Sequence, residues 1–163
     1  MMKGANLRDE QHVVRVVTFA KLRLNEHSEP VGVNYTALMR REHEDGLSVT
    51  ALEYFEGPRD VQIVAAVHAL RASNFKPTPK GGFAIANVAE IHNTCAARNS
   101  KVRIIHWPVD DNNAHCDIRQ LPRDDVELLE RLATVVFAEL HMNSNFPAGD
   151  APAPPKPATT PWP

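Results

Sequence analysis

The stretch DDVELLERLATVVFAELH, residues 124–141, carries the strongest secondary-structure pattern in the chain. Its apolar side chains recur at spacings of three and four residues, which places them on one face of an α-helix: Val126, Leu129, Leu132, Ala133, Val136, Phe137 and Leu140. Asp124 and Glu127 form the D-x-x-E variant of a capping box at its start. We therefore expect an amphipathic helix over 124–141 that supplies a large part of the core.

Two further helices are indicated upstream of this segment. Gly57-Pro58-Arg59-Asp60 is a helix start, because Pro58 at the first helical position loses no hydrogen bond and Asp60 favours the first turn. The helical spacing that follows ends near Ser73, before Pro77 and Pro79. Asn34 or Thr36 can cap a short helix over residues 37–40.

The remaining apolar runs have strand character. They are rich in β-branched and aromatic residues or alternate between large and small side chains, which is typical of β-structure: 12–19, 47–52, 83–91 and 101–107. The order is strand, short helix, strand, helix, strand, strand, helix. This order predicts an α+β fold, a mixed or antiparallel sheet of about four to five strands with two main helices packed on one face.

The chain length and the proline distribution predict the domain organisation. A chain of 163 residues, 43% hydrophobic, fits one domain. We expect a flexible N-terminus over 1–11, a globular domain over 12–145 and a disordered Pro-rich tail over 146–163, where prolines concentrate and apolar side chains are scarce. An alternative is that the tail is a ligand for an aromatic groove, with Pro152 and Pro155 in P-x-x-P spacing or Trp162 as an anchor.

Composition excludes several classes of partner. Eighteen basic against twenty acidic residues give a formal charge of −2, so we expect no nucleic-acid partner. No apolar run approaches the length of a membrane span, and the N-terminus lacks the apolar region of a signal peptide. Two cysteines, Cys95 and Cys116, are too few for a disulfide framework. These features predict a cytoplasmic location, no membrane contact and no cofactor.

Residues 107–118 concentrate acids, amides, a histidine and a thiol between a strand and the last helix. Loops at strand ends commonly present binding or catalytic groups. General acid–base chemistry here would use His115, with Asp110 or Asp117 fixing its tautomer. Asp and Asn are also what turns select, because their side chains bond nearby backbone groups, so a structural loop is the competing interpretation.

Metal binding and nucleophilic catalysis are less well supported than acid–base chemistry, because the candidate ligands and nucleophiles lack the required spacing. His92-x-x-Cys95 supplies two zinc-ligating types, but His115 and Cys116 are neighbours and would point to opposite sides of an extended segment. We therefore predict no metal site. Ser48 lies in no nucleophile-elbow motif, and no helix start adjoins Cys116 to activate its thiol.

Arg15 is the unusual residue of the first strand, because an arginine is costly to bury without a partner. It would either reach solvent or grip an anion, with Ser48, His106 and Asn112 as further candidate ligand-binding residues. The leading hypothesis is a non-catalytic binding or accessory module that uses the Asp110–Asp117 loop for a protein or small-molecule partner. The alternative is a small enzyme, a hydrolase or transferase with His115 as general acid or base, acting on a phosphate-bearing or nucleotide-derived substrate.

Overall fold

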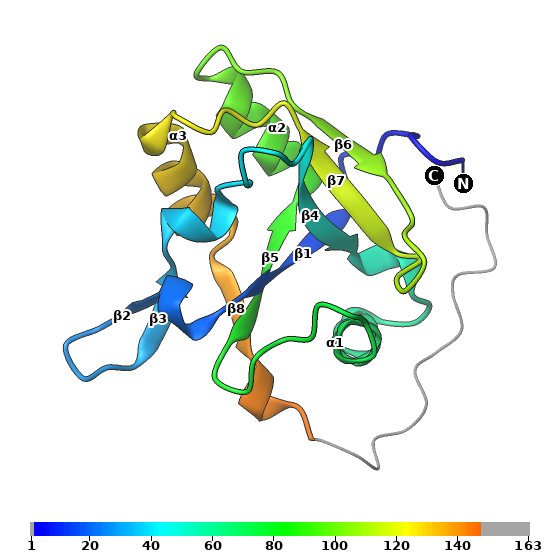
Figure 1. Cartoon of the computed structure of the whole chain (residues 1–163), viewed down its shortest axis with the longest axis vertical. Coiled ribbons are helices and arrows are strands. Elements are labelled where there is room, and N and C mark those ends of the chain that lie inside the picture. Colours follow the sequence, from blue (N-terminus) through cyan, green and yellow to red (C-terminus); the bar gives the residue numbers. More distant parts are fainter. Residues whose placement is uncertain (1, 148–163) are drawn as a thin grey trace.

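A six-stranded sheet forms the centre of the molecule (Figure 1), in the computed structural model that describes residues 2–147. Its strand order is β6-β7-β4-β1-β5-β8, and all neighbouring pairs run antiparallel. The strands are β1 (His12–Val17), β4 (Gly46–Ala51), β5 (Gly82–Asn87), β6 (Arg103–His106), β7 (His115–Arg119) and β8 (Glu139–Met142). The α+β class is confirmed, whereas the expected four to five strands were too few because β7 and β8 were not predicted.

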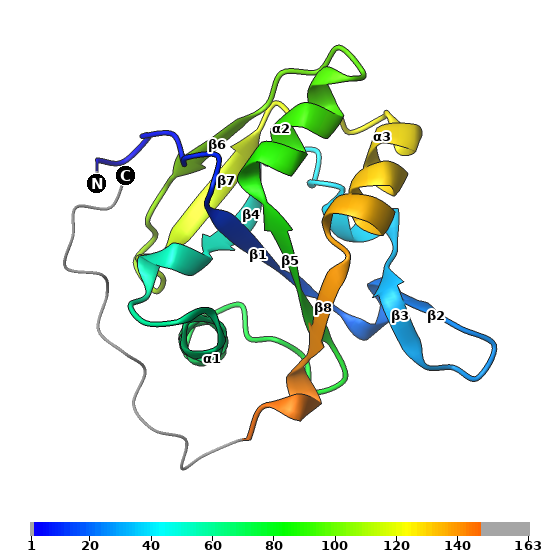
Figure 2. The ribbon, with the colours of Figure 1, turned by 180° about the vertical axis from the view of Figure 1, so that it is seen from behind.

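A separate hairpin projects from the body of the domain (Figures 1 and 2). It consists of β2 (Leu22–Leu24) and β3 (Pro30–Val33), paired antiparallel. The chain reverses through Asn25, whose side-chain oxygen accepts hydrogen bonds from the backbone N–H groups of His27 and Glu29. Ser28 adopts a positive φ of 60° in this turn.

Helices cover both faces of the sheet, which corrects the expectation that they pack on one face (Figure 2). Helix α1 (Arg59–Arg71) packs on one face, and α2 (Val88–Ala96) and α3 (Val126–Arg131) pack on the other. Alternation along β1 explains the division, because Val13 and Val17 face α2 and α3 while Val14 faces α1. The sheet therefore separates two apolar clusters.

Four short 3-10 helices complete the architecture of the described residues. They are Phe19–Lys21, Tyr35–Leu38, Leu52–Tyr54 and Asn143–Asn145. The second of them replaces the short helix expected over 37–40 and begins two residues earlier, with the Asn34 side chain accepting a hydrogen bond from the Thr36 N–H. No helix within residues 2–147 is long and apolar enough to cross a bilayer.

The strand expected over 83–91 is wrong in its second half, because the chain enters α2 at Val88. Asn87 causes the change: its side chain accepts a hydrogen bond from the Glu90 N–H and so caps the helix. Its amide also donates to the Asp9 carbonyl, which fixes the capping residue against the N-terminal segment.

The helix expected over 124–141 is also shorter than its apolar pattern. Asp125, one residue beyond the expected cap, accepts a hydrogen bond from the Leu128 N–H. After α3 the helix widens into a π-helix over Leu132–Val136, and the Phe137 N–H bonds to the Leu132 carbonyl. The Thr134 hydroxyl donates to the Glu130 carbonyl at 2.8 Å, which competes with the regular helical bond. The remainder of the expected helix is β8.

Both ends of the described chain pack on the domain. Gly4, Ala5 and Leu7 form backbone hydrogen bonds with β6, although residues 1–11 are expected to be flexible. Phe146 lies edge-on to Phe83, with ring centroids 6.0 Å apart. The remainder of the expected tail, residues 148–163, lies outside the described residues.

Candidate functional site

His115 and Asp117, two of the predicted catalytic residues, lie on β7 and not in a loop. Strand pairing places Asp117 opposite Ser48 and His115 opposite Thr50 on β4. Paired residues of antiparallel strands project from the same face. The structure therefore brings His115, Asp117 and Ser48 together on the face of the sheet that carries α1.

The imidazole of His115 is oriented by two oxygen atoms. Its Nδ1 lies 2.7 Å from the Trp107 carbonyl oxygen, and its Nε2 lies 3.8 Å from Asp117 Oδ1. The carbonyl accepts a proton only from Nδ1, so the neutral ring carries its hydrogen there and turns its basic Nε2 toward the carboxylate side. The Trp107 carbonyl therefore fixes the tautomer, a role that the sequence interpretation gave to Asp110 or Asp117.

Asp117 is shared with a second cation. Arg119 Nη2 lies 3.3 Å from Asp117 Oδ2, and the guanidinium carbon lies 4.2 Å from the centroid of the Trp107 ring. Lys3 Nζ lies at the same distance from that ring centroid. Both are cation–π contacts, which tie the N-terminal segment and β7 to Trp107.

Arg15 and His106 lie on the face of the sheet opposite to that of His115. Arg15 shares the side of Val13 and Val17, and its guanidinium donates to two backbone carbonyls, those of Ala37 and Ser48, each at 2.9 Å. Burial lowers the pKa of Arg15 to about 10. Its partners within the chain are thus the carbonyl oxygens of Ala37 and Ser48.

His106 is buried beside the apolar cluster under α2 and α3. It pairs with Cys116 across the β6–β7 ladder, and both side chains point toward the face covered by α2 and α3. Burial lowers the pKa of His106, and the nearby His115 acts in the same direction. His106 therefore does not join His115 in one concave site.

The turn between β6 and β7 uses its polar side chains structurally. Val109 and Asn112 exchange backbone hydrogen bonds across the turn, and Asp110 is exposed at its tip. Asn112 donates from Nδ2 to the Thr50 hydroxyl at 3.0 Å and accepts from the Ala114 N–H. These bonds anchor the hairpin to β4, as the structural interpretation of the loop expects.

Asp111 ties this turn to the loop that follows α1. Its Oδ2 accepts a hydrogen bond from the Asn74 N–H at 2.6 Å. The next residue, Phe75, is 84% exposed, the most exposed aromatic side chain within residues 2–147. Sequence reasoning missed Phe75; the signal was an isolated aromatic residue between polar neighbours and prolines, with no apolar partner at helical or strand spacing.

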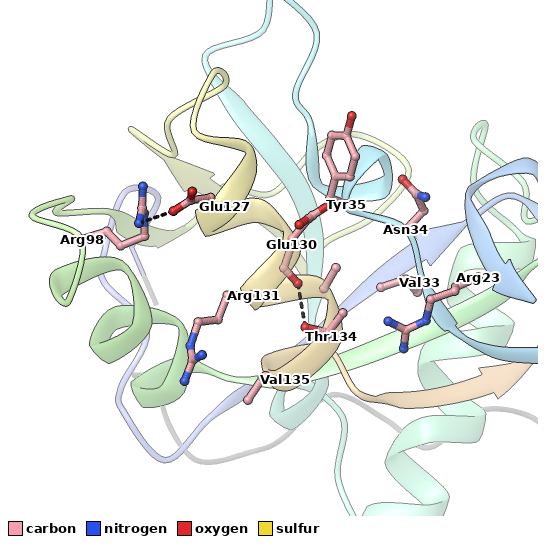
Figure 3. Close-up of a pocket in the computed structure, with 11 residues that line it drawn as sticks. Arg23, Val33, Asn34, Tyr35, Arg98, Glu127, Glu130, Arg131, Thr134 and Val135 are labelled. Atoms are coloured by element: carbon pink, nitrogen blue, oxygen red, sulfur yellow. Dashed lines mark hydrogen bonds and ion pairs between the residues drawn. The ribbon is translucent and has the colours of Figure 1, made fainter.

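A groove with a volume of about 660 Å³ lies elsewhere, between the β2–β3 hairpin and the π-helix (Figure 3). Val33, Ala133 and Val135 give it an apolar part, and Arg23 and Arg131 extend from opposite walls. Arg98, at one end, is paired with Asp125 at 2.9 Å and with Glu127 at 3.0 Å. None of the predicted site residues lines this groove.

Within residues 2–147, no group of three or more His, Cys, Asp and Glu side chains is arranged to hold a metal ion. Comparison of the chain with protein-family models, curated proteins and solved structures yields no match.

Proposed function

We propose that this protein is a non-catalytic binding module whose recognition surface combines Phe75 with the turn of residues 109–112. The partner is a protein with an apolar pocket for the phenyl ring and a basic rim facing Asp110. The observation that carries the proposal is the 2.6 Å hydrogen bond from the Asn74 N–H to Asp111, which holds an exposed aromatic side chain beside an acidic turn.

Burial of the Phe75 ring would be the main source of affinity. Fully burying such a side chain is worth about 1.5–3 kcal/mol, and aromatic anchors commonly dominate binding at interfaces. Asp110 is exposed at the tip of the same turn. A basic rim on the partner would therefore speed association and orient the two proteins.

The bond between Asp111 and Asn74 would preorganise this surface. A hydrogen bond to a carboxylate is stronger than one between neutral groups. Holding the Phe75 loop in place before binding reduces the ordering entropy that association costs. Asp111 is therefore a positioning residue, and Phe75 is the contact residue.

Photo-crosslinking at two matched positions tests the proposal. A photoreactive phenylalanine analogue at position 75 should give a discrete adduct, whereas the same analogue at Phe19, an exposed aromatic in the first 3-10 helix, should give none. For the crosslinked protein in purified form, Phe75→Ala should weaken binding by at least about tenfold, the equivalent of 1.4 kcal/mol.

The natural and variant proteins should unfold at the same temperature, since Phe75 is exposed. Asp111→Asn should weaken binding less than Phe75→Ala, because only positioning is lost. Unchanged affinity for Phe75→Ala would refute the proposal. Binding of a small molecule at this surface would refute the part of the proposal that names a protein as the partner.

A second candidate function is the small enzyme with His115 as general acid or base, favoured by the orientation of its ring between Trp107 and Asp117. Its substrate would be phosphate-bearing or nucleotide-derived, and it would bind near Ser48 without help from Arg15. Thermal unfolding with a panel of nucleotides and dinucleotides tests this, because a ligand of the folded state raises stability. His115→Ala and Asp117→Asn should abolish the ligand shift. If no ligand shifts the natural protein and His115→Ala loses about 1–3 kcal/mol of stability, the histidine is structural.

A further inference from the structure

We infer that the outer edge of β6 is a peptide-binding site, which residues 3–7 of the chain itself occupy. The ligand is a segment of another protein with the pattern Lys-Gly-x-x-Leu, and it takes the place of residues 3–7 when these open. Phe75 is not part of this site, so the inference does not depend on the proposed function.

The backbone of β6 holds the N-terminal segment. β6 is an edge strand of the sheet, and the segment pairs with its outer side (Figure 2). The Gly4 N–H donates to the His106 carbonyl at 2.7 Å, and the His106 N–H donates to the Ala5 carbonyl at 2.8 Å. The Leu7 N–H donates to the Ile104 carbonyl at 2.9 Å. An edge strand offers the same backbone groups to any extended peptide, which is a common mode of peptide recognition.

Leu7 is the apolar anchor of the segment. Its side chain is 5% exposed and belongs to the core cluster under α2 and α3. Lys3 and Asn6 are exposed, and Gly4 and Ala5 are only partly buried. In strand addition the backbone bonds supply affinity and side-chain pockets supply specificity. The pocket of Leu7 therefore selects an apolar residue at this position of the ligand.

A turn at the start of the segment places a cation on Trp107. The Ala5 N–H donates to the Met2 carbonyl at 3.1 Å, and Gly4 within this turn has a φ of 89°, a conformation that favours glycine. Lys3 Nζ lies 4.2 Å from the centroid of the Trp107 ring, a cation–π contact. The lysine, the glycine and the leucine of the pattern thus each have a defined contact or conformation.

The segment opens without unfolding the sheet. Leu7 is the only fully buried residue of 2–7, and regions with few buried contacts open at low cost in free energy. β6 stays paired with β7 meanwhile, as in the bond from the Trp107 N–H to the His115 carbonyl at 2.9 Å. A tethered segment competes at an effective concentration on the order of millimolar. The chain's own segment therefore keeps the affinity for an external peptide low.

Fluorescence anisotropy with a labelled peptide of residues 1–8, MMKGANLR, tests the site. In the full chain, Lys3→Glu with Leu7→Asp weakens the chain's own segment and leaves β6 unchanged; this double variant is named the opened variant. It should bind the peptide with a dissociation constant at least about tenfold lower than that of the natural chain. A peptide with the same two substitutions should bind the opened variant at least about tenfold more weakly than the natural peptide.

Two control substitutions are made in the opened variant. Phe75→Ala should leave the affinity for the peptide unchanged, because Phe75 lies outside the site. Trp107→Ala should weaken binding and should also remove most of the difference between the natural peptide and a Lys3→Ala peptide, since the ring that the cation contacts is gone. Unfolding temperatures show whether each variant is folded, and Leu7→Ala replaces Leu7→Asp if the charge prevents folding.

Hydrogen exchange of the natural chain tests the opening without any substitution. The His106 N–H bonds to the segment, whereas the Trp107 N–H bonds to β7. After correction for intrinsic rates, the His106 N–H should exchange at least about tenfold faster than the Trp107 N–H, because opening of the segment frees only the first.

A folded opened variant that does not bind the peptide overturns the proposal. Equal affinity for the natural and the substituted peptide overturns it as well, since the predicted side-chain contacts then do not contribute. Equal protection of the His106 and Trp107 N–H groups shows that the segment does not open by itself, which overturns its role as a replaceable ligand. Loss of peptide binding through Phe75→Ala would place the contact at another surface and would equally overturn the assignment to β6.

Discussion

Burial controls the chemistry of both cysteines. Cys95 on α2 and Cys116 on β7 are fully buried, and burial raises the pKa of the first thiol to about 11 and of the second to about 12. Only the thiolate is nucleophilic. We therefore expect neither cysteine to react with iodoacetamide at pH 7.5 in the folded protein, whereas both should react in denaturant. Mass spectrometry counts the adducts, and rapid native labelling at Cys116 would contradict this prediction.

Glu53 should make stability depend on pH in an unusual direction. Burial raises the pKa of its carboxyl above the ordinary value, against the opposing effect of hydrogen bonds from His12. The folded state thus favours the protonated form. The stabilisation is complete below the ordinary pKa of a glutamate and is lost as pH rises through the raised pKa.

Comparison of Glu53→Gln with the natural protein isolates this effect. The difference in free energy of unfolding, natural minus variant, should fall as pH rises from about 4 toward neutrality, the window that follows from a raised glutamate pKa. Denaturant titrations at each pH provide the measurement. The exposed Glu42→Gln is the control, and a difference that grows with pH would show the wrong sign.

Single residues show where sequence reasoning reached its limit. His115 and Asp117 were grouped as candidate catalytic residues of one loop, whereas they share a face because both lie on β7, which was not predicted. Arg15 was expected to reach solvent or grip an anion, and its hydrogen bonds to the carbonyls of Ala37 and Ser48 were not predicted. The positions of backbone carbonyls depend on the tertiary structure and do not affect the pattern of side chains in the sequence. The hydrogen bonds of Arg15 could therefore not be predicted.

At the level of elements, competing local bonds decided which patterns became structure. The apolar repeat after Asp125 is helical only as far as Val136, since Thr134 takes the Glu130 carbonyl and the backbone then bonds with wider spacing. Glu139–Met142 instead completes the sheet by pairing with β5. Leu140 is apolar and fits both the helical repeat and a strand. Only its pairing with β5, which the sequence does not show, decides between helix and strand.

The buried face of the C-terminal helical segment should dominate its contribution to stability. Leu132 is 1% exposed, whereas Glu130 is exposed. Leu132→Ala should cost about 2–5 kcal/mol, and Glu130→Ala less than about 0.5 kcal/mol, because only the first leaves a cavity. Urea unfolding monitors both variants. Equal effects would mean that this segment is rotated relative to the described structure.

For the molecule as a whole, α1 and the last described residues are joined by a clamp. Arg71 donates hydrogen bonds to the carbonyls of Asn143, Phe146 and Pro147, and Phe146 covers Phe83. This segment closes the α1 side of the core. From sequence alone it was assigned to a tail, since a single aromatic residue before a proline has no periodicity.

Two truncations measure the clamp. A chain ending at Pro147 should unfold at the natural temperature, and a chain ending at Asn145 should unfold several degrees lower, at about 2–4 °C per kcal/mol for a domain of this size. The loss follows from removing the Phe146 ring and two acceptors of Arg71. Differential scanning calorimetry provides the comparison, and identical transitions for the two chains would show that Phe146 adds nothing.

The strand order has a consequence for how the chain reaches this structure during synthesis. The central strand β1 emerges first, yet its neighbour β5 follows many residues later, as the pairing of Val13 with Ala86 shows. The edge of the sheet closes only when Met142 pairs with Gly82. Such long-range pairing makes folding slow and leaves unpaired strand edges on the nascent chain. Strands in the first half of the chain therefore keep unpaired edges until the second half has been synthesised.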